Sequence, residues 1–175
     1  MLGQAERLLR GEFEGGATRF QLIPSPRLNA LADGRYVQVT TAIGNYVADD
    51  EELAAILAHE LAHNVLRHRA RLDAAGIDRG LLGHFGRNAR LVRATEVEAD
   101  RLSVYLLERA GYDPEAAVRF WRRFGGGLLG LFGGTHHPSA RRRLELLREE
   151  IAAIRRARAA GALPLPAFLA RTSSR

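Results

Sequence analysis

The sequence contains neither cysteine nor lysine in its 175 residues. Without cysteine the chain cannot form a disulfide scaffold, a thiolate zinc finger, a cysteine nucleophile or an iron–sulfur site. Without lysine it cannot use a lysine-dependent phosphate loop, a Schiff base or a serine–lysine dyad. All 26 basic residues are therefore arginine, and with 20 acidic residues the formal net charge is +6.

Long apolar runs are missing as well. No uninterrupted apolar stretch approaches the roughly 18 residues that a membrane-spanning helix needs. Met1 to Arg10 carries acidic and basic side chains where a signal peptide has its apolar core. We therefore expect no transmembrane segment, and a chain that is either cytoplasmic or exported by a signal absent from this sequence.

The order of patterns along the chain predicts an α+β fold that is mostly helical. Alternating residues with turn signals predict a small N-terminal sheet of two or three strands between Thr18 and Thr41. Capping signals and helical periodicity predict helices over 1–10, 50–69, 87–110, 114–124 and 138–159. The length suits one domain, assigned to residues 1–160, and residues 161–175 are expected to be an extended or disordered tail.

The pattern His59-Glu60-Leu61-Ala62-His63 lies inside the first long predicted helix. Histidines four residues apart share one face of a helix, so both imidazoles can reach the same metal ion. Glu60 is one residue away, which places its carboxylate beside the metal, as a general base for a water molecule that the metal activates. The alternative is an ordinary pair of histidines on a helix surface.

A catalytic zinc ion needs a third protein ligand and one open position. Glu96 and Asp100 share a face of the second long predicted helix, whereas Glu98 points away from it. Glu96 is the candidate ligand, and Asp100 is the candidate acceptor for an imidazole N–H. The alternative is a solvated acidic stripe. His68 is turned about 140° from His63 on an ideal helix, so we expect it to be exposed or to cap the helix.

These residues carry a resemblance to a known family. The two motifs, residues 59–63 and 96–100, resemble those of the HtpX/BepA/CAAX-prenyl-endopeptidase family of gluzincin zinc metallopeptidases. Residues 29–41 resemble the segment that precedes the active-site helix in this family. His137-Pro138-Ser139, followed by Arg143, resembles a late segment of the family. The similarity spans roughly Asn29 to Leu147, which is most of the chain.

The resemblance implies a zincin-like catalytic domain whose small sheet packs beside the active-site helix. It implies one zinc ion per chain, held by His59, His63 and Glu96. It also implies that Glu60 is the catalytic base and that Asp100 supports the site from behind. Protein or peptide substrates follow from the same resemblance.

The developing oxyanion of peptide hydrolysis needs a hydrogen-bond donor besides the metal. The sequence offers Arg143, then His136, then Tyr105 as candidates. For Arg143 the alternative is a solvated helix start. The residues 36–41 are our candidate for an exposed edge strand that holds substrate by backbone pairing, with an ordinary core strand as the alternative.

His136 and His137 follow a glycine-rich stretch, residues 125–134, that we expect to be a mobile loop. Either histidine could swing onto the metal as a fourth ligand, displace the water and inhibit the enzyme. The alternative is ordinary capping of the helix that Pro138 opens.

The preferred function is a zinc-dependent endopeptidase that acts on misfolded or exported proteins. The lack of a spanning helix favours the soluble, periplasmic branch of the family over prenyl-protein processing, with a cytoplasmic location as the alternative. A chaperone-like assembly or quality-control factor with a latent metal site is the main rival. Nucleic acid is not expected as a partner, because the arginines alternate with glutamates and no nucleic-acid motif accompanies them.

Overall fold

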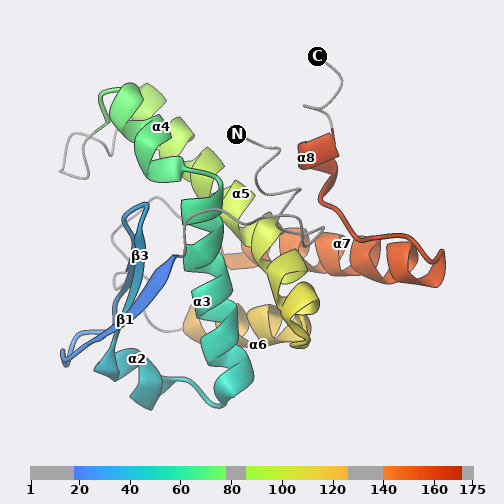
Figure 1. The fold of residues 1–175 in the computed structure, drawn as a ribbon, viewed down its shortest axis with the longest axis horizontal. Helices are drawn as coiled ribbons and strands as arrows, with labels where there is room; N and C mark the ends of the chain where they lie inside the picture. Colours follow the sequence, from blue (N-terminus) through green and yellow to red (C-terminus); the bar gives the residue numbers. More distant parts are fainter. Residues whose placement is uncertain (1–17, 78–85, 126–139, 171–175) are drawn as a thin grey trace.

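The computed structural model describes residues 18–77, 86–125 and 140–170 (Figure 1). The predicted helix over 1–10 and the glycine-rich stretch 125–134, apart from Gly125, lie outside these residues. So do His84, His136 and His137, and with them the predicted oxyanion and inhibitory roles of the last two.

The small N-terminal sheet forms as predicted. Its strands β1 (Arg19–Ile23), β2 (Ala30–Ala32) and β3 (Tyr36–Thr40) lie in the order β1–β3–β2. β1 is parallel to β3 and exposed along its whole length, whereas β2 is antiparallel to β3. The prediction that residues 36–41 form an exposed edge is wrong, because β3 is central and its backbone is paired on both sides. Alternation reveals a strand but not its neighbours.

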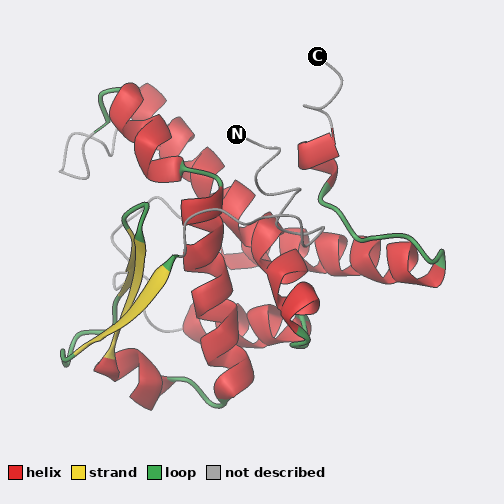
Figure 2. Cartoon of the chain, in the orientation of Figure 1, coloured by secondary structure: helices red, strands yellow, loops and turns green. Residues whose placement is uncertain are grey.

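The rest of the described chain is helical (Figure 2). The helices are α2 (Thr41–Tyr46), α3 (Asp50–Val65), α4 (His68–Ala74), α5 (Gly86–Ala110), α6 (Glu115–Gly125), α7 (Ala140–Ala159) and α8 (Ala167–Ala170). In Figure 1 α3 stands at the centre, with the sheet on one side and α5 and α6 packed against it. α7 packs against α5 and α6. The fold is the expected α+β class.

The start of α3 is fixed by its own side chains. The Asp49 carboxylate accepts a hydrogen bond from the backbone N–H of Glu52 at 2.8 Å. The Glu52 carboxylate accepts in turn from the N–H of Ala48 at 2.9 Å. These bonds resemble those of a capping box, except that Glu52 accepts from the residue before the N-cap. They fix the residue at which α3 begins.

The end of α3 differs from the prediction. The helix stops at Val65 rather than near Arg69, and Arg67 adopts the left-handed conformation with φ 53°. A left-handed residue cannot continue a right-handed helix, so the chain turns and restarts as α4 at His68. The regular helix assumed for His68 is therefore broken between α3 and that residue.

One side chain ties the sheet to α3. Asn64 accepts a hydrogen bond from the N–H of Gly34 at 2.7 Å, and its amide donates to the carbonyl of Tyr36 at 3.0 Å. Gly34 has φ +102°, a conformation that favours glycine. These bonds hold the β2–β3 turn beside the last turn of α3, next to His63 in sequence.

The predicted tail is only partly extended. Residues 162–166 form no helix or strand, but Ala167–Ala170 form the short helix α8. Leu169 is 1% exposed, and the guanidinium of Arg101 lies over the ring of Phe168 at 5.0 Å. The helix α8 thus departs from the expected extended or disordered tail, because Leu169 is buried and Phe168 is partly buried.

Candidate metal centre

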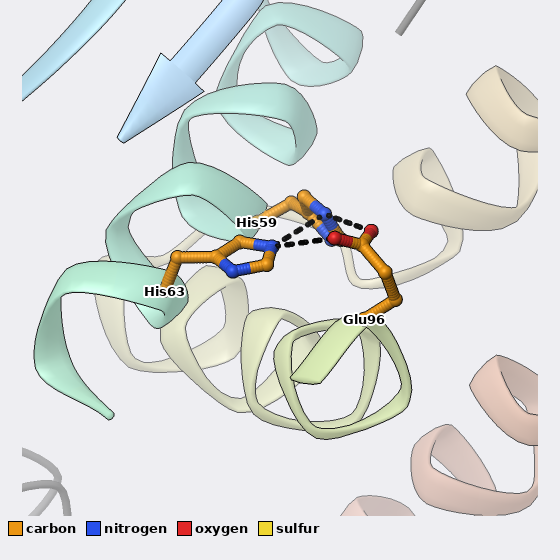
Figure 3. Close-up of side chains that lie close together, drawn as sticks. All are labelled: His59, His63 and Glu96. Carbon is orange, nitrogen blue, oxygen red and sulfur yellow. Dashed lines mark hydrogen bonds and ion pairs between the residues drawn. The ribbon is translucent and has the colours of Figure 1, made fainter. Parts of the chain in front are cut away.

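Three side chains from two helices converge in the interior, His59 and His63 from α3 and Glu96 from α5 (Figure 3). The Nε2 atoms of the two histidines are 3.2 Å apart. Oε2 of Glu96 lies 3.4 Å from Nε2 of His59, and Oε1 lies 3.5 Å from Nε2 of His63. Among the described residues this is the one group of three or more histidine, aspartate or glutamate side chains that could hold a metal.

The spacing of these atoms fits a metal better than direct hydrogen bonds. Hydrogen bonds from N–H to oxygen are usually about 2.7 to 3.2 Å long, shorter than both contacts of Glu96. Ligands at about 2.0 to 2.1 Å from a tetrahedral zinc ion are about 3.3 to 3.4 Å from one another. Each imidazole Nε2 atom therefore already lies at about this spacing from the other Nε2 atom and from one oxygen of the Glu96 carboxylate, Oε2 for His59 and Oε1 for His63.

The pocket also favours a positive charge at this point. Burial lowers the pKa of His59, but hydrogen bonds and negative charge from Asp100 and Glu96 outweigh burial and raise it to about 10. Burial dominates at His63 and lowers its pKa to about 3. A positive charge is thus favoured on His59, whereas His63 is held neutral.

Asp100 contacts the ring nitrogen of His59 that faces away from the cluster, and Arg143 pairs with Asp100. Nδ1 of His59 lies 3.0 Å from Oδ1 of Asp100, and these buried atoms have no further hydrogen-bond partner in the described chain. Nε of Arg143 donates to Oδ2 of Asp100 at 2.6 Å, and its Nη2 lies 3.5 Å from Glu96. Trp121 covers the guanidinium at 3.6 Å. Asp100 is fully buried, so its charge is balanced by Arg143 and oriented toward the imidazole.

Arg143 and Tyr105 differ from the sequence expectations. Arg143 is 3% exposed, so the reading as a solvated helix start is wrong, although its neighbour Arg141 is exposed. The Tyr105 hydroxyl donates to Glu150 at 2.7 Å and joins α5 to α7. Tyr105 therefore has a structural partner and is not the donor that the sequence proposed.

His68 contradicts its prediction most clearly. It is 1% exposed, and its Nδ1 lies 2.9 Å from Nδ1 of His63. Its Nε2 lies 3.1 Å from Oε2 of Glu98, which also pairs with Arg71. The expectation failed because the helix breaks at Arg67. Glu98 points away from Glu96 as predicted, and it meets α4 instead of solvent.

The contacts of Glu98 with His68 and Arg71 affect how the free energy of unfolding changes at low pH. Burial would raise the pKa of Glu98, but hydrogen bonds from His68 and Arg71 and the charge of Arg71 lower it to about 2. A carboxyl whose pKa is lowered by folding contributes stability above its unfolded pKa, near 4.5, and loses it as the pH falls through about 2.

We therefore predict that Glu98→Gln reduces the loss of stability on acidification. Between pH 5 and pH 3 the wild-type chain should lose about 2 kcal/mol more unfolding free energy than the variant. Urea unfolding of both proteins in the presence of a chelator measures the difference without a contribution from metal release. Equal losses in the two proteins would show that Glu98 is not stabilised as its contacts indicate.

The similarity of the chain to known proteins identifies its family. The family model described as peptidase family M48 matches residues 6–84 and 86–151. The chain belongs to peptidase family M48. This confirms the resemblance found in the motifs, and a metal is implied by the family as well as by the cluster.

Relatives of this M48 chain carry protease names. It is 34% identical over 148 residues to the mitochondrial metalloendopeptidase OMA1 of Schizosaccharomyces pombe, covering 72% of this chain and 44% of that protein. It is 29% identical over 133 residues to the beta-barrel assembly-enhancing protease of Yersinia pestis, covering 59% and 27%. It is 28% identical over 130 residues to the beta-barrel assembly-enhancing protease of Escherichia coli, and the match covers 58% of this chain and 27% of that protein.

This M48 chain spans less than half the length of each of these three relatives. A metalloprotease that acts on proteins is the activity that the family and the names support. No helix in the described ranges is long and apolar enough to cross a membrane.

Proposed function

We propose that this M48 chain is a zinc-dependent endopeptidase in which His59, His63 and Glu96 hold one zinc ion. The observation that supports it is the spacing of polar atoms on two packed helices: the Nε2 atoms of His59 and His63 lie 3.2 Å apart, and they lie 3.4 and 3.5 Å from the two oxygens of the Glu96 carboxylate. Two imidazoles and a carboxylate form a ligand set that suits zinc. We further propose that residues 1–160 form a single metallopeptidase domain.

The residues around the cluster divide the chemistry between them. A bound zinc ion supplies a Lewis acid that polarises the peptide carbonyl and lowers the pKa of the attacking water. Glu60, which is 8% exposed and adjacent to His59 on α3, takes the proton from this water and passes it to the leaving amine. Asp100 accepts the Nδ1 hydrogen of His59 and so turns its Nε2 toward the metal.

Arg143 is proposed to stabilise the negative charge that develops during the reaction. Its guanidinium is fixed by Asp100 and Trp121 and lies beside Glu96. It thus places a positive charge next to the centre where negative charge develops during attack on a peptide carbonyl. Because the charge is held rigidly before reaction, little reorganisation is needed when the oxyanion forms.

The proposal is tested by metal analysis of the purified chain together with cleavage of casein. We expect about one zinc per chain, loss of cleavage in the presence of a chelator, and recovery when zinc is added back. A zinc content far below one per chain, or cleavage that persists after complete chelation, would contradict it.

A second candidate is an assembly or quality-control factor for exported proteins with a latent metal site. The name of the Yersinia pestis relative, which combines assembly with protease, favours keeping it. This candidate requires no peptide-bond cleavage, so the Glu60 variant in the Discussion separates it from the enzyme. In both cases we propose the periplasm as the location, with the cytoplasm as the alternative, which cell fractionation distinguishes.

We propose no nucleic-acid partner for this chain. Arginines of α7 pair with glutamates of the same helix or of neighbouring ones: Arg141 with Glu145, Arg155 with Glu115 and Arg158 with Glu108. Such pairing neutralises the basic residues that a nucleic-acid surface would need. Protein substrates therefore remain the proposed partners.

A further inference from the structure

His68 links the candidate ligand His63 to a charged pair on the other side. It is the first residue of α4, and its ring lies between His63 of α3 and Glu98 of α5. Both of its ring nitrogens are engaged, Nδ1 with His63 at 2.9 Å and Nε2 with Glu98 at 3.1 Å. With 1% exposure, solvent cannot replace either contact.

The contacts determine where the hydrogens lie. Glu98 pairs with Arg71, and an ionised carboxylate can only accept hydrogen bonds. Nε2 of His68 must therefore carry a hydrogen, and in a neutral imidazole this leaves Nδ1 as an acceptor. Two ring nitrogens 2.9 Å apart share one hydrogen, so that hydrogen belongs to Nδ1 of His63.

The hydrogen on Nδ1 of His63 determines the state of the other ring nitrogen, Nε2. A neutral imidazole with its hydrogen on Nδ1 has a lone pair on Nε2. That Nε2 is the atom 3.2 Å from His59 and 3.5 Å from Glu96. On the other histidine, Asp100 faces Nδ1 and leaves Nε2 for the cluster in the same way. Nε2 is thus the nitrogen that faces the cluster in both imidazoles, and two separate carboxylates set this orientation.

The backbone turn between α3 and α4 places His68 against His63. The left-handed Arg67 interrupts the path of α3 and returns the chain, so that His68 lies against His63 rather than on a far face. Arg71, one turn further along α4, fixes the Glu98 carboxylate that receives His68. Arg67, His68 and Arg71 therefore all contribute to the contact between His68 and His63.

We propose that His68, held by Glu98, is a positioning residue that fixes the tautomer and ring orientation of His63 for metal binding. The inference rests on the proposed zinc site. It assigns a task to a histidine outside the metal-binding motif, and it predicts that metal affinity depends on a side chain that does not touch the metal.

The test compares zinc affinity in the full chain, measured by competition with a coloured chelator. His68→Leu removes the acceptor at similar volume and should weaken zinc binding by about 10- to 100-fold. His68→Asn places an amide oxygen near the position of Nδ1, where it can accept from His63, and should recover part of that loss. The absorption spectrum of the cobalt-substituted proteins should change in His68→Leu and return toward wild type in His68→Asn.

A second pair of variants covers the case in which His68→Leu fails to fold. Glu98→Gln keeps the size of the side chain, but its amide can donate as well as accept, so the tautomer of His68 is no longer fixed. It should weaken zinc binding severalfold. The matched control is Glu108→Gln on the same helix, which breaks the ion pair with Arg158 away from the cluster and should leave zinc affinity unchanged.

The outcomes separate this inference from the proposed function. If the wild-type chain binds no zinc, the zinc site itself is wrong. If the wild-type chain binds zinc and both His68→Leu and Glu98→Gln bind it as tightly, the site stands and the role of His68 is overturned. Equal weakening in His68→Asn and His68→Leu, or in Glu108→Gln and Glu98→Gln, would reduce His68 to a packing residue and also overturn the inference.

Discussion

Glu60→Gln is expected to lower cleavage of casein by about 10²- to 10⁴-fold while leaving the zinc content unchanged. Glutamine matches glutamate in size but cannot take a proton from the attacking water. The cluster of donor atoms consists of His59, His63 and Glu96, so metal binding does not depend on the Glu60 carboxylate. Initial rates of cleavage and metal analysis of the same preparation measure both quantities.

The control is Glu51→Gln, which makes the same substitution near the start of α3, where the Glu51 carboxylate accepts from the N–H of Asp113. It should cleave at the wild-type rate. A Glu60→Gln protein that still cleaves at that rate would remove Glu60 from the mechanism. A variant that lost its zinc together with its activity would instead place Glu60 among the ligands. Should the wild-type chain show no cleavage but prevent aggregation of client proteins, with or without Glu60, the assembly factor would be favoured.

Removing zinc is expected to lower the melting temperature of the chain by about 8 to 16 °C. A ligand that binds only the folded state, at a free concentration about 1,000 times its dissociation constant, stabilises that state by about 4 kcal/mol. For a domain of this size each kcal/mol corresponds to about 2 to 4 °C. The ion would join α3 to α5, two helices that form much of the core. Thermal unfolding followed by circular dichroism, with zinc and with chelator, measures the shift.

Glu96→Gln provides the specific comparison for this measurement. It replaces the charged oxygen donor with a neutral one on α5, and should reduce the zinc-dependent part of the melting temperature. Glu108→Gln on the same helix should retain the full shift. An unchanged melting temperature after complete metal removal from the wild-type chain would contradict the coupling between the metal and the fold.

Local signals in the sequence predicted much of this molecule. The capping signals ahead of α3 and α6 are Asp49 and Asp113, and their carboxylates accept hydrogen bonds from the backbone N–H groups of Glu52 and Glu115. Such caps involve residues two or three apart, so the sequence contains the whole interaction. The sharing of a helix face by residues four apart is equally local, and it correctly paired His59 with His63.

The packing of α3 against α5 was a weaker inference from the sequence, which rested on chemistry. A catalytic zinc ion held by two imidazoles needs a third protein ligand, and Glu96, with Asp100 as acceptor for an imidazole N–H, offers one at the required spacing. The sequence offers Arg143 as a candidate oxyanion donor, but its burial under Trp121 depends on how α6 and α7 pack. No periodicity reports such a contact between distant segments.

The main error came from one backbone conformation. The apolar pattern of α3 continues to Leu66, and nothing in the identity of Arg67 indicates a left-handed residue, since glycine and asparagine are the usual choices there. Extending the helix past that point turned His68 away from His63. The central position of β3 was missed for a different reason: strand order is decided by contacts that lie outside each strand.

The exposed strand β1 has a practical consequence for work with the isolated chain. Phe20 is 54% exposed and Leu22 is 64% exposed, on a strand that pairs with β3 along only one side within the described part of the chain. An open strand edge with apolar side chains is a template for adding a strand from another molecule, and proteins usually blunt it with charge or proline. We therefore expect concentrated stocks to aggregate through β1. Kinetic measurements should be made over a dilution series, so that self-association is not mistaken for inhibition.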